Sequence, residues 1–291
     1  MFVAKAAVVG AGIMGGEIAQ VVASAGVPVL LKDIDPALVD RGLERAGEVT
    51  GAQLRRLADD GKLAADEVSD ELAQTIGRIT GTTDYGGFGD VDIVIEAVPE
   101  RLEIKQAVFA DLDAVTPGHA ILASNTSSLS ITEIGEGTTR PDRVIGFHFF
   151  YPASIMRLVE VIEGDETSEE TLFAAAGFAR QIRKQPIRCG EGPGFVVNRV
   201  LMSAVSELWR VQQEQGLAVE EVDRIIQDAK AAPVGPFFLS DLLGLDTVLH
   251  VAEHLHESYG ERFFVSAPMR ELVKAGQLGE KTGVGFYSHG G

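Results

Sequence analysis

The feature that most constrains the fold is a glycine-rich turn near the N-terminus, Gly10-Ala11-Gly12-Ile13-Met14-Gly15. It follows an apolar run typical of a strand, Val3 to Val9, and precedes a segment with helical spacing, Ile13 to Ala25. In such a unit the first glycine permits a tight turn, the second lets a pyrophosphate approach the backbone, and the third lets helix and strand pack closely. We therefore expect a dinucleotide site whose contacts in the turn are Gly10, Gly12, Ile13, Met14 and Gly15.

An acidic residue, Asp33, follows the second predicted strand, Val27 to Lys32. A carboxylate at this point accepts hydrogen bonds from the adenosine ribose hydroxyls and repels a 2′-phosphate, so it favours NAD over NADP. Lys32 beside it weakens that preference slightly. The helix N-terminus provides amide donors for the pyrophosphate, which helps a chain of net charge −18 to bind an anion. The alternative at this point is a glycine-rich turn that binds no ligand.

Strands and helices alternate in the first two thirds of the chain. Pro36 begins a helix, and with a second helix from about Ala65 to Gly77 it forms a hairpin longer than a crossover needs. A further helix is expected over Arg101 to Val115, and Thr167-Ser168-Glu169-Glu170 predicts a capping box that begins another. The later buried strands are expected at Val91 to Val98, Ala120 to Ser124 and Val144 to Phe147, with one last strand at Gln185 to Cys189. This alternation predicts a doubly wound, mainly parallel sheet.

The residue pattern changes beyond Gly190-Glu191-Gly192-Pro193-Gly194, where patterns typical of strands end. Helices are expected at Phe195 to Gln215, Val219 to Ala229, Leu239 to Tyr259 and Ala267 to Ala275. The sequence thus predicts an α/β fold in two parts: a Rossmann-type, NAD-binding domain over residues 1–189, and an all-α C-terminal domain over residues 190–291.

Composition limits the partners. The net charge of −18 argues against nucleic acid and anionic membranes, and no apolar run reaches the length of a membrane span. Cys189 is the one cysteine of the sequence, which excludes an internal disulfide and fits a reducing cytoplasm; we interpret it as a small apolar filler. We expect no metal site.

Polar residues follow several predicted strands. Ser124-Asn125-Thr126-Ser127-Ser128 lies where such sheets bind ligands, and it can cap a helix, bind a ligand, or do both. His148 ends an apolar strand and is either a core residue or a general base. Period-2 alternation puts Glu160 on an apolar face, where a carboxylate needs a partner, and His148 is the economical one. Asn198 lies in the first turns of a helix expected to bury Val196, Val197, Val200 and Leu201; without further context it is interpreted as a surface residue.

Taken together, these segments resemble the L-3-hydroxyacyl-CoA dehydrogenase family over nearly the whole chain. Besides the glycine turn, the resemblance rests on segments starting at Ile95, Ser124, Gly146, Leu158 and Gly194, and on Gly235-Pro236-Phe237, Asp241 to Asp246 and Lys281 to Tyr287. The resemblance implies NAD-dependent interconversion of (S)-3-hydroxyacyl-CoA and 3-ketoacyl-CoA by a homodimer that pairs through its C-terminal domain.

The resemblance also assigns roles. It implies that His148 is the general base and Glu160 its carboxylate partner, and that Ser127 and Asn198 hold the substrate oxygen. Glu100, Lys105, Ser127 and Lys281 are implied to contact the cofactor. Two departures stand out: Tyr151 occupies a position where the family usually has Asn, and Asp59 and Asp60 fall near its basic CoA contact. The substitutes for that contact are Arg55, Arg56 and Lys62, or these form a solvated helix face.

Two other hypotheses remain at this point. One is an NAD-dependent dehydrogenase of a free 3-hydroxy acid, of the gulonate type. The other is an NAD-binding protein without catalysis, which the joint presence of His148, Glu160, Ser127 and Asn198 disfavours. The sequence gives neither the acyl chain length nor the direction or pathway of the reaction.

Overall fold

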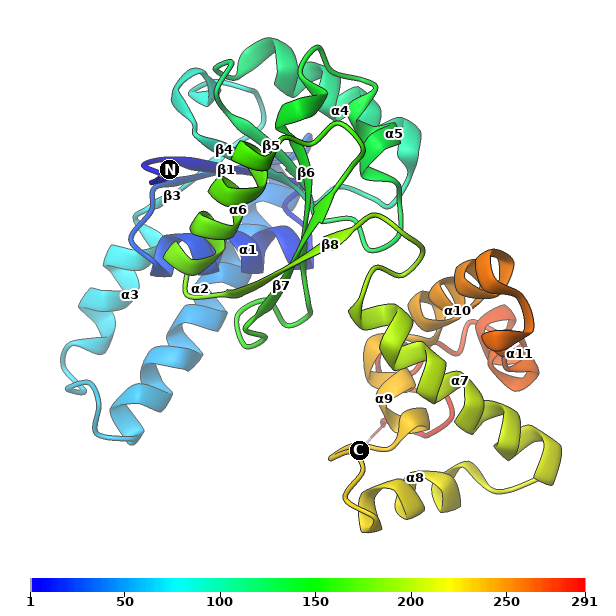
Figure 1. The fold of residues 1–291 in the computed structure, drawn as a ribbon. Helices are drawn as coiled ribbons and strands as arrows, with labels where there is room; N and C mark the ends of the chain where they lie inside the picture. Colours follow the sequence, from blue (N-terminus) through cyan, green and yellow to red (C-terminus); the bar gives the residue numbers. More distant parts are fainter. Residues whose placement is uncertain (1, 291) are drawn as a thin grey trace. The chain divides into compact units, whose positions relative to one another are not determined.

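The computed structural model describes residues 2–290, which form two compact units, and the boundary along the chain falls between Glu191 and Gly192. In the described part of the first unit, one eight-stranded sheet has the order β3-β2-β1-β4-β5-β6-β7-β8 (Figure 1). The strands are β1 (Ala6–Val9), β2 (Val29–Lys32), β3 (Ile79–Thr82), β4 (Ile93–Glu96), β5 (Ile121–Ser124), β6 (Val144–Phe149), β7 (Leu158–Glu163) and β8 (Gln185–Gly190). Neighbouring strands from β3 to β6 are parallel, and β7 turns antiparallel to β6. The predicted doubly wound, mainly parallel sheet is confirmed.

Helices cover both faces of this sheet because its strands present apolar side chains on both faces. The helices are α1 (Ile13–Ser24), α2 (Pro36–Asp59), α3 (Val68–Ile76), α4 (Leu102–Val115), α5 (Ile131–Gly135) and α6 (Glu169–Gln181). One face packs Val8, Ile95 and Phe147 against Ile18 of α1 and Phe178 of α6. The hairpin of α2 and α3 extends away from the sheet (Figure 1).

The sequence analysis missed one strand of this unit and misplaced one helix cap. The edge strand β3 was not expected, because its sequence Ile-Thr-Gly-Thr buries only Ile79 and so carries almost no apolar signal. The capping box is also displaced: Ser168 is the N-cap of α6, and its Oγ accepts a hydrogen bond from Thr171 N. Thr167 instead donates from Oγ1 to Val144 O at 2.7 Å, which ties it to the sheet before the helix begins.

The second unit is helical. Its helices are α7 (Val197–Gln215), α8 (Val219–Asp228), α9 (Pro236–Leu243), α10 (Leu245–Tyr259) and α11 (Ala267–Lys274). The expected single helix from Leu239 to Tyr259 is two helices, because Gly244 has φ +92°, which a right-handed helix cannot accommodate. Short 3₁₀ turns elsewhere in the chain cover Phe88–Asp90, Pro141–Arg143, Gly260–Arg262 and Glu280–Thr282.

The buried face of α7 differs from the expected one. Val200 is 66% exposed and Leu201 is 38% exposed, whereas Met202, Val205 and Trp209 join the apolar core of the second unit. The prediction that Val200 and Leu201 are buried is wrong, because several valines and leucines in succession do not show which side of the helix faces the core. Among the described residues, the helices are all too short or too polar to cross a membrane.

Candidate active site

The glycine turn joins β1 to α1 and has little free space on its inner side. Gly10 has φ +101°, and a Cβ on it would lie 2.5 Å from Ala97 O. A Cβ on Gly15 would lie 1.7 Å from Gly10 O, so the turn itself excludes a side chain there. A Cβ on Gly12, in contrast, would meet no atom within 4 Å. The turn is therefore closed toward the sheet and open at Gly12, where backbone and a phosphate can approach closely.

Asp33 holds this turn in place. Its Oδ2 accepts a hydrogen bond from Ala11 N at 2.7 Å, and its Oδ1 accepts one from Ile34 N at 2.7 Å. Each carboxylate oxygen keeps a further lone pair for a ribose hydroxyl. Lys32 is buried, with its Nζ 4.3 Å from the centre of the Tyr85 ring. Lys32 is thus held against an aromatic ring, a cation–π contact.

These features fit a dinucleotide. The first turn of α1 presents N–H groups that have no partner inside the helix, and the open side of Gly12 leads to them. The sheet order reverses between β1 and β4, the place where doubly wound sheets bind dinucleotides. With Asp33 at the end of β2 for the adenosine ribose, the ends of β4 and β5 on the other side of the reversal are the positions that would hold the nicotinamide half.

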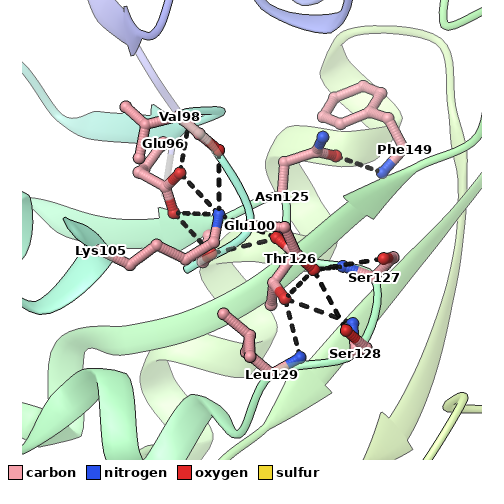
Figure 2. A network of polar contacts seen from close by, with 11 residues as sticks. Glu96, Val98, Glu100, Lys105, Asn125, Thr126, Ser127, Ser128, Leu129 and Phe149 are labelled. Carbon is pink, nitrogen blue, oxygen red and sulfur yellow. Dashed lines mark hydrogen bonds and ion pairs between the residues drawn. The ribbon is translucent and has the colours of Figure 1, made fainter. Parts of the chain in front are cut away.

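A buried polar network occupies the ends of β4 and β5 (Figure 2). Glu96, the last residue of β4, is fully buried and accepts hydrogen bonds from Val98 N at 2.6 Å and Ser124 Oγ at 2.7 Å. Lys105 of α4 is also buried, and its Nζ lies 2.8 Å from Glu96 Oε1 and 3.2 Å from Glu100 Oε2. One ammonium therefore sits between two carboxylates, which makes the predicted cofactor residues Glu100 and Lys105 partners of each other.

Glu100 extends the network to the loop after β5. Its Oε1 accepts hydrogen bonds from Thr126 Oγ1 at 2.6 Å, Ser127 N at 2.8 Å and Ser127 Oγ at 3.2 Å. Burial alone would raise the pKa of the Glu100 carboxyl, but Lys105, Thr126 and Ser127 outweigh burial and lower that pKa. Thr126 Oγ1 also accepts a hydrogen bond from Leu129 N. The loop thus organises its own backbone while it presents Ser127 at the carboxyl edge of the sheet.

His148 and Glu160 are direct cross-strand partners in the antiparallel pair of β6 and β7. His148 Nδ1 lies 2.8 Å from Glu160 Oε2, with the side chains 8% and 0% exposed. The Phe150 ring lies 4.6 Å from the imidazole, centre to centre. The carboxylate accepts from Nδ1–H and so makes Nε2 the basic nitrogen of the neutral ring. His148 and Glu160 are therefore brought together as the sequence indicated.

Two side chains, those of Asn125 and Lys184, fix the backbone around this pair. Asn125 Oδ1 accepts a hydrogen bond from Phe149 N at 2.8 Å, which joins the end of β5 to the residue after His148. Lys184 Nζ donates to Ala153 O and to Met156 O in the loop between β6 and β7. Burial lowers the pKa of Lys184, and the nearby Glu17 carboxylate opposes this. Sequence reasoning did not identify Lys184 as a buried residue.

The second unit carries the remaining predicted contacts. Asn198 is half-buried as the second residue of α7. Lys281 Nζ forms an ion pair with Asp246 Oδ1 at 2.8 Å. Fully buried Asp241 accepts hydrogen bonds from Phe286 N and Tyr287 N, each at 2.9 Å. The Asp241 and Lys281 segments therefore fold onto each other, and the cofactor role of Lys281 and the substrate role of Asn198 stay predictions.

The predicted CoA contacts lie on the hairpin of α2 and α3. Arg55, Arg56 and Lys62 are exposed, and Lys62 Nζ pairs with Asp60 Oδ2 at 3.0 Å. These positions are compatible with binding and with a solvated face alike, so this role also stays a prediction. Tyr151, the residue that departs from the family, is 47% exposed at the start of the β6–β7 loop.

Sequence reasoning missed Glu96, although a signal was present. Glu96 follows Ile93-Val94-Ile95 in a strand expected to be buried, and a carboxylate in such a run needs a cation or several donors. The same argument was applied to Glu160. Lys105, one of the predicted cofactor contacts, is the cation that pairs with the buried Glu96 carboxylate.

Comparison with protein-family models gives two matches that together span almost the whole chain. Residues 5–192 match the 3-hydroxyacyl-CoA dehydrogenase NAD binding domain, and residues 194–289 match the 3-hydroxyacyl-CoA dehydrogenase C-terminal domain. The first match contains the glycine turn, the buried network and the His148–Glu160 pair.

Individual relatives agree with these matches. The chain is 39% identical over 286 residues to a 3-hydroxybutyryl-CoA dehydrogenase of Clostridioides difficile, with 98% of this chain and 99% of the relative covered. It is 41% identical to a 3-hydroxyadipyl-CoA dehydrogenase of Escherichia coli, with 97% of this chain and 58% of that protein covered. Among solved structures, (S)-3-hydroxybutyryl-CoA dehydrogenase from Ralstonia eutropha superposes with a TM-score of 0.90 at 38% identity, covering 100% of both chains.

Proposed function

The chain belongs to the 3-hydroxyacyl-CoA dehydrogenase family, and on this premise we propose that it interconverts (S)-3-hydroxyacyl-CoA and 3-ketoacyl-CoA with NAD. The observation that carries the proposal is the His148–Glu160 pair, in the same unit as a turn built for a dinucleotide. NAD, when bound, accepts the hydride from C3 of the substrate. A base must remove the hydroxyl proton at the same time, and an oriented imidazole does this at neutral pH.

Each residue then has a defined task. His148 takes the hydroxyl proton on Nε2, and the resulting imidazolium is stabilised by the Glu160 carboxylate 2.8 Å from Nδ1. Ser127 and Asn198 donate to the substrate oxygen. Ser127 Oγ gives up its 3.2 Å contact with Glu100 to do so, while Ser127 N at 2.8 Å keeps that carboxylate oxygen bonded.

The two parts of the chain divide the work in this proposal. Residues 1–189 bind NAD, and residues 190–291 contribute to substrate binding and to a homodimer. Arg55, Arg56 and Lys62 meet the CoA phosphates. The exposed Val200 and Leu201 on α7 provide apolar surface suited to pairing of two copies. We place the enzyme in the cytoplasm and its reaction in fatty-acid or related acyl-CoA metabolism.

The proposal is tested with the purified chain on acetoacetyl-CoA, longer 3-ketoacyl-CoAs and free acetoacetate, each with NADH and with NADPH. We expect turnover of the thioesters with NADH. Faster turnover of the free acid would instead favour a dehydrogenase of free 3-hydroxy acids. NADH binding without turnover of any substrate would favour a non-catalytic NAD-binding protein.

A further inference from the structure

The buried network at the ends of β4 and β5 contains more negative than positive charge (Figure 2). Glu96 and Glu100 share the single ammonium of Lys105. Glu100 accepts three contacts from Thr126 and Ser127 besides Lys105, as an ionised carboxylate does. Glu96 likewise faces only donors or hydroxyls: Val98 N, Ser124 Oγ and the Lys105 ammonium. The cluster of Glu96, Lys105 and Glu100 therefore holds one net negative charge.

Burial keeps this charge effective. The Glu96 and Lys105 side chains are 0% and 1% exposed, and the Glu100 side chain is 31% exposed. Water screens charges at such depth much less than at the surface. The cluster also lies on the side of the β1–β4 strand-order reversal that is opposite Asp33, which is where the nicotinamide half of a dinucleotide extends.

The two forms of the cofactor differ in charge at that end. The oxidised nicotinamide ring carries a formal positive charge, whereas the reduced ring is neutral. A fixed negative charge nearby therefore stabilises binding of the oxidised form and leaves binding of the reduced form almost unchanged.

We propose that Glu96 is a positioning residue that fixes the Lys105 ammonium and gives the cluster the net negative charge by which the site discriminates NAD⁺ from NADH. Without Glu96, Lys105 and Glu100 form a neutral pair. The inference rests on the NAD-binding part of the proposed function, and it does not depend on which acyl-CoA is the substrate.

The test compares dissociation constants of NAD⁺ and NADH, measured directly on the protein without substrate. In the Glu96→Gln variant, which keeps the shape and removes the charge, we expect the ratio of the NAD⁺ constant to the NADH constant to rise about tenfold. The Ser124→Ala variant is the matched control, because it removes one hydrogen bond to Glu96 and keeps every charge. The Glu96→Asp variant keeps the charge with a shorter side chain. Both variants should leave the ratio within about twofold of the wild type, since the charge that sets it is unchanged.

An unchanged ratio in Glu96→Gln would overturn the inference, as would an equal rise in Ser124→Ala. If Glu96→Gln gives no cooperative melting transition, Glu100→Gln removes the same unit of charge and should raise the ratio in the same direction; a fall or no change would again refute the inference. Failure of the proposed function is distinguishable, because it would show as wild-type protein that binds both nucleotides with the expected ratios and turns over no acyl-CoA.

Discussion

His148 Nδ1 lies 2.8 Å from Glu160 Oε2 because the two residues are register partners in the antiparallel pair of β6 and β7. The strand pairing itself sets their separation, since directly opposed residues on one face of a sheet project side by side. β6 is parallel to β5, so the same strand also brings His148 to the carboxyl edge of the sheet. The change of direction at β7 then places the Glu160 carboxylate opposite this base.

The glycine turn gives a matched pair of variants. Gly12→Ala should fold with a melting temperature close to the wild type, because its Cβ meets no atom within 4 Å, and yet it should weaken NADH binding about tenfold or more by crowding the pyrophosphate. Gly15→Ala should lower the melting temperature, because its Cβ would lie 1.7 Å from Gly10 O. Thermal melts and NADH fluorescence titrations measure both effects. The assignment is wrong if Gly12→Ala binds NADH normally.

Cofactor preference should depend on Asp33 and not on Lys32. Asp33→Asn removes the charge that repels a 2′-phosphate, so the ratio of kcat/KM for NADH to that for NADPH should fall about tenfold or more. Lys32→Met should leave that ratio within about twofold, because Lys32 Nζ is held over the Tyr85 ring. A large change in Lys32→Met would show that Lys32 reaches the cofactor.

Stability should depend on pH through Glu100. Its pKa lies below the ordinary value of 4.5 in the folded protein, so it contributes stability above that value and loses this contribution as the pH falls through the lowered pKa. The difference in melting temperature between wild type and Glu100→Gln should therefore be constant near neutral pH and shrink below pH 4.5. Melts from pH 7 to pH 3 check this; a difference that grew on acidification would contradict it.

The second unit should depend on Asp241. Asp241→Ala leaves Phe286 N and Tyr287 N without their buried acceptor and should lower the free energy of unfolding by about 3 kcal/mol. Asp246→Ala is the control, because its pair with Lys281 is exposed and contributes about 1 kcal/mol or less. Trp209, the one tryptophan in the sequence, is buried in this unit, so its fluorescence in urea reports the transition. The prediction is wrong if Asp241→Ala and Asp246→Ala lower the free energy of unfolding by the same amount.

Much of the fold follows from apolar periodicity and from turn chemistry. The strands that carry the site have long apolar signals, so β4, β5 and β6 were predicted, and the polar residues at the ends of β5 and β6 were identified with them. β3 was missed because an edge strand needs only one buried residue, Ile79. The break at Gly244 was missed because a glycine within an apolar helical pattern does not reveal its φ angle.

The site was predictable where a buried charged residue needed a polar partner. Glu160 on an apolar face required a partner, and His148 was the suitable candidate. The partners of Glu96 and Asp241 lie on other elements: Lys105, nine residues after Glu96, is on α4, and the backbone of Phe286 is 45 residues from Asp241. Helical spacing does not specify which helix residue reaches which strand end, so these contacts emerge only in three dimensions.

His148 is, in the proposed function, the base in the oxidation of a 3-hydroxyacyl-CoA. The most direct measurement is the rate of (S)-3-hydroxybutyryl-CoA oxidation by His148→Ala, with the dissociation constant of NADH measured on the same protein. We expect the rate to fall about a hundredfold or more while the NADH constant stays within about twofold of the wild type. An unchanged rate with NADH bound normally would contradict the claim.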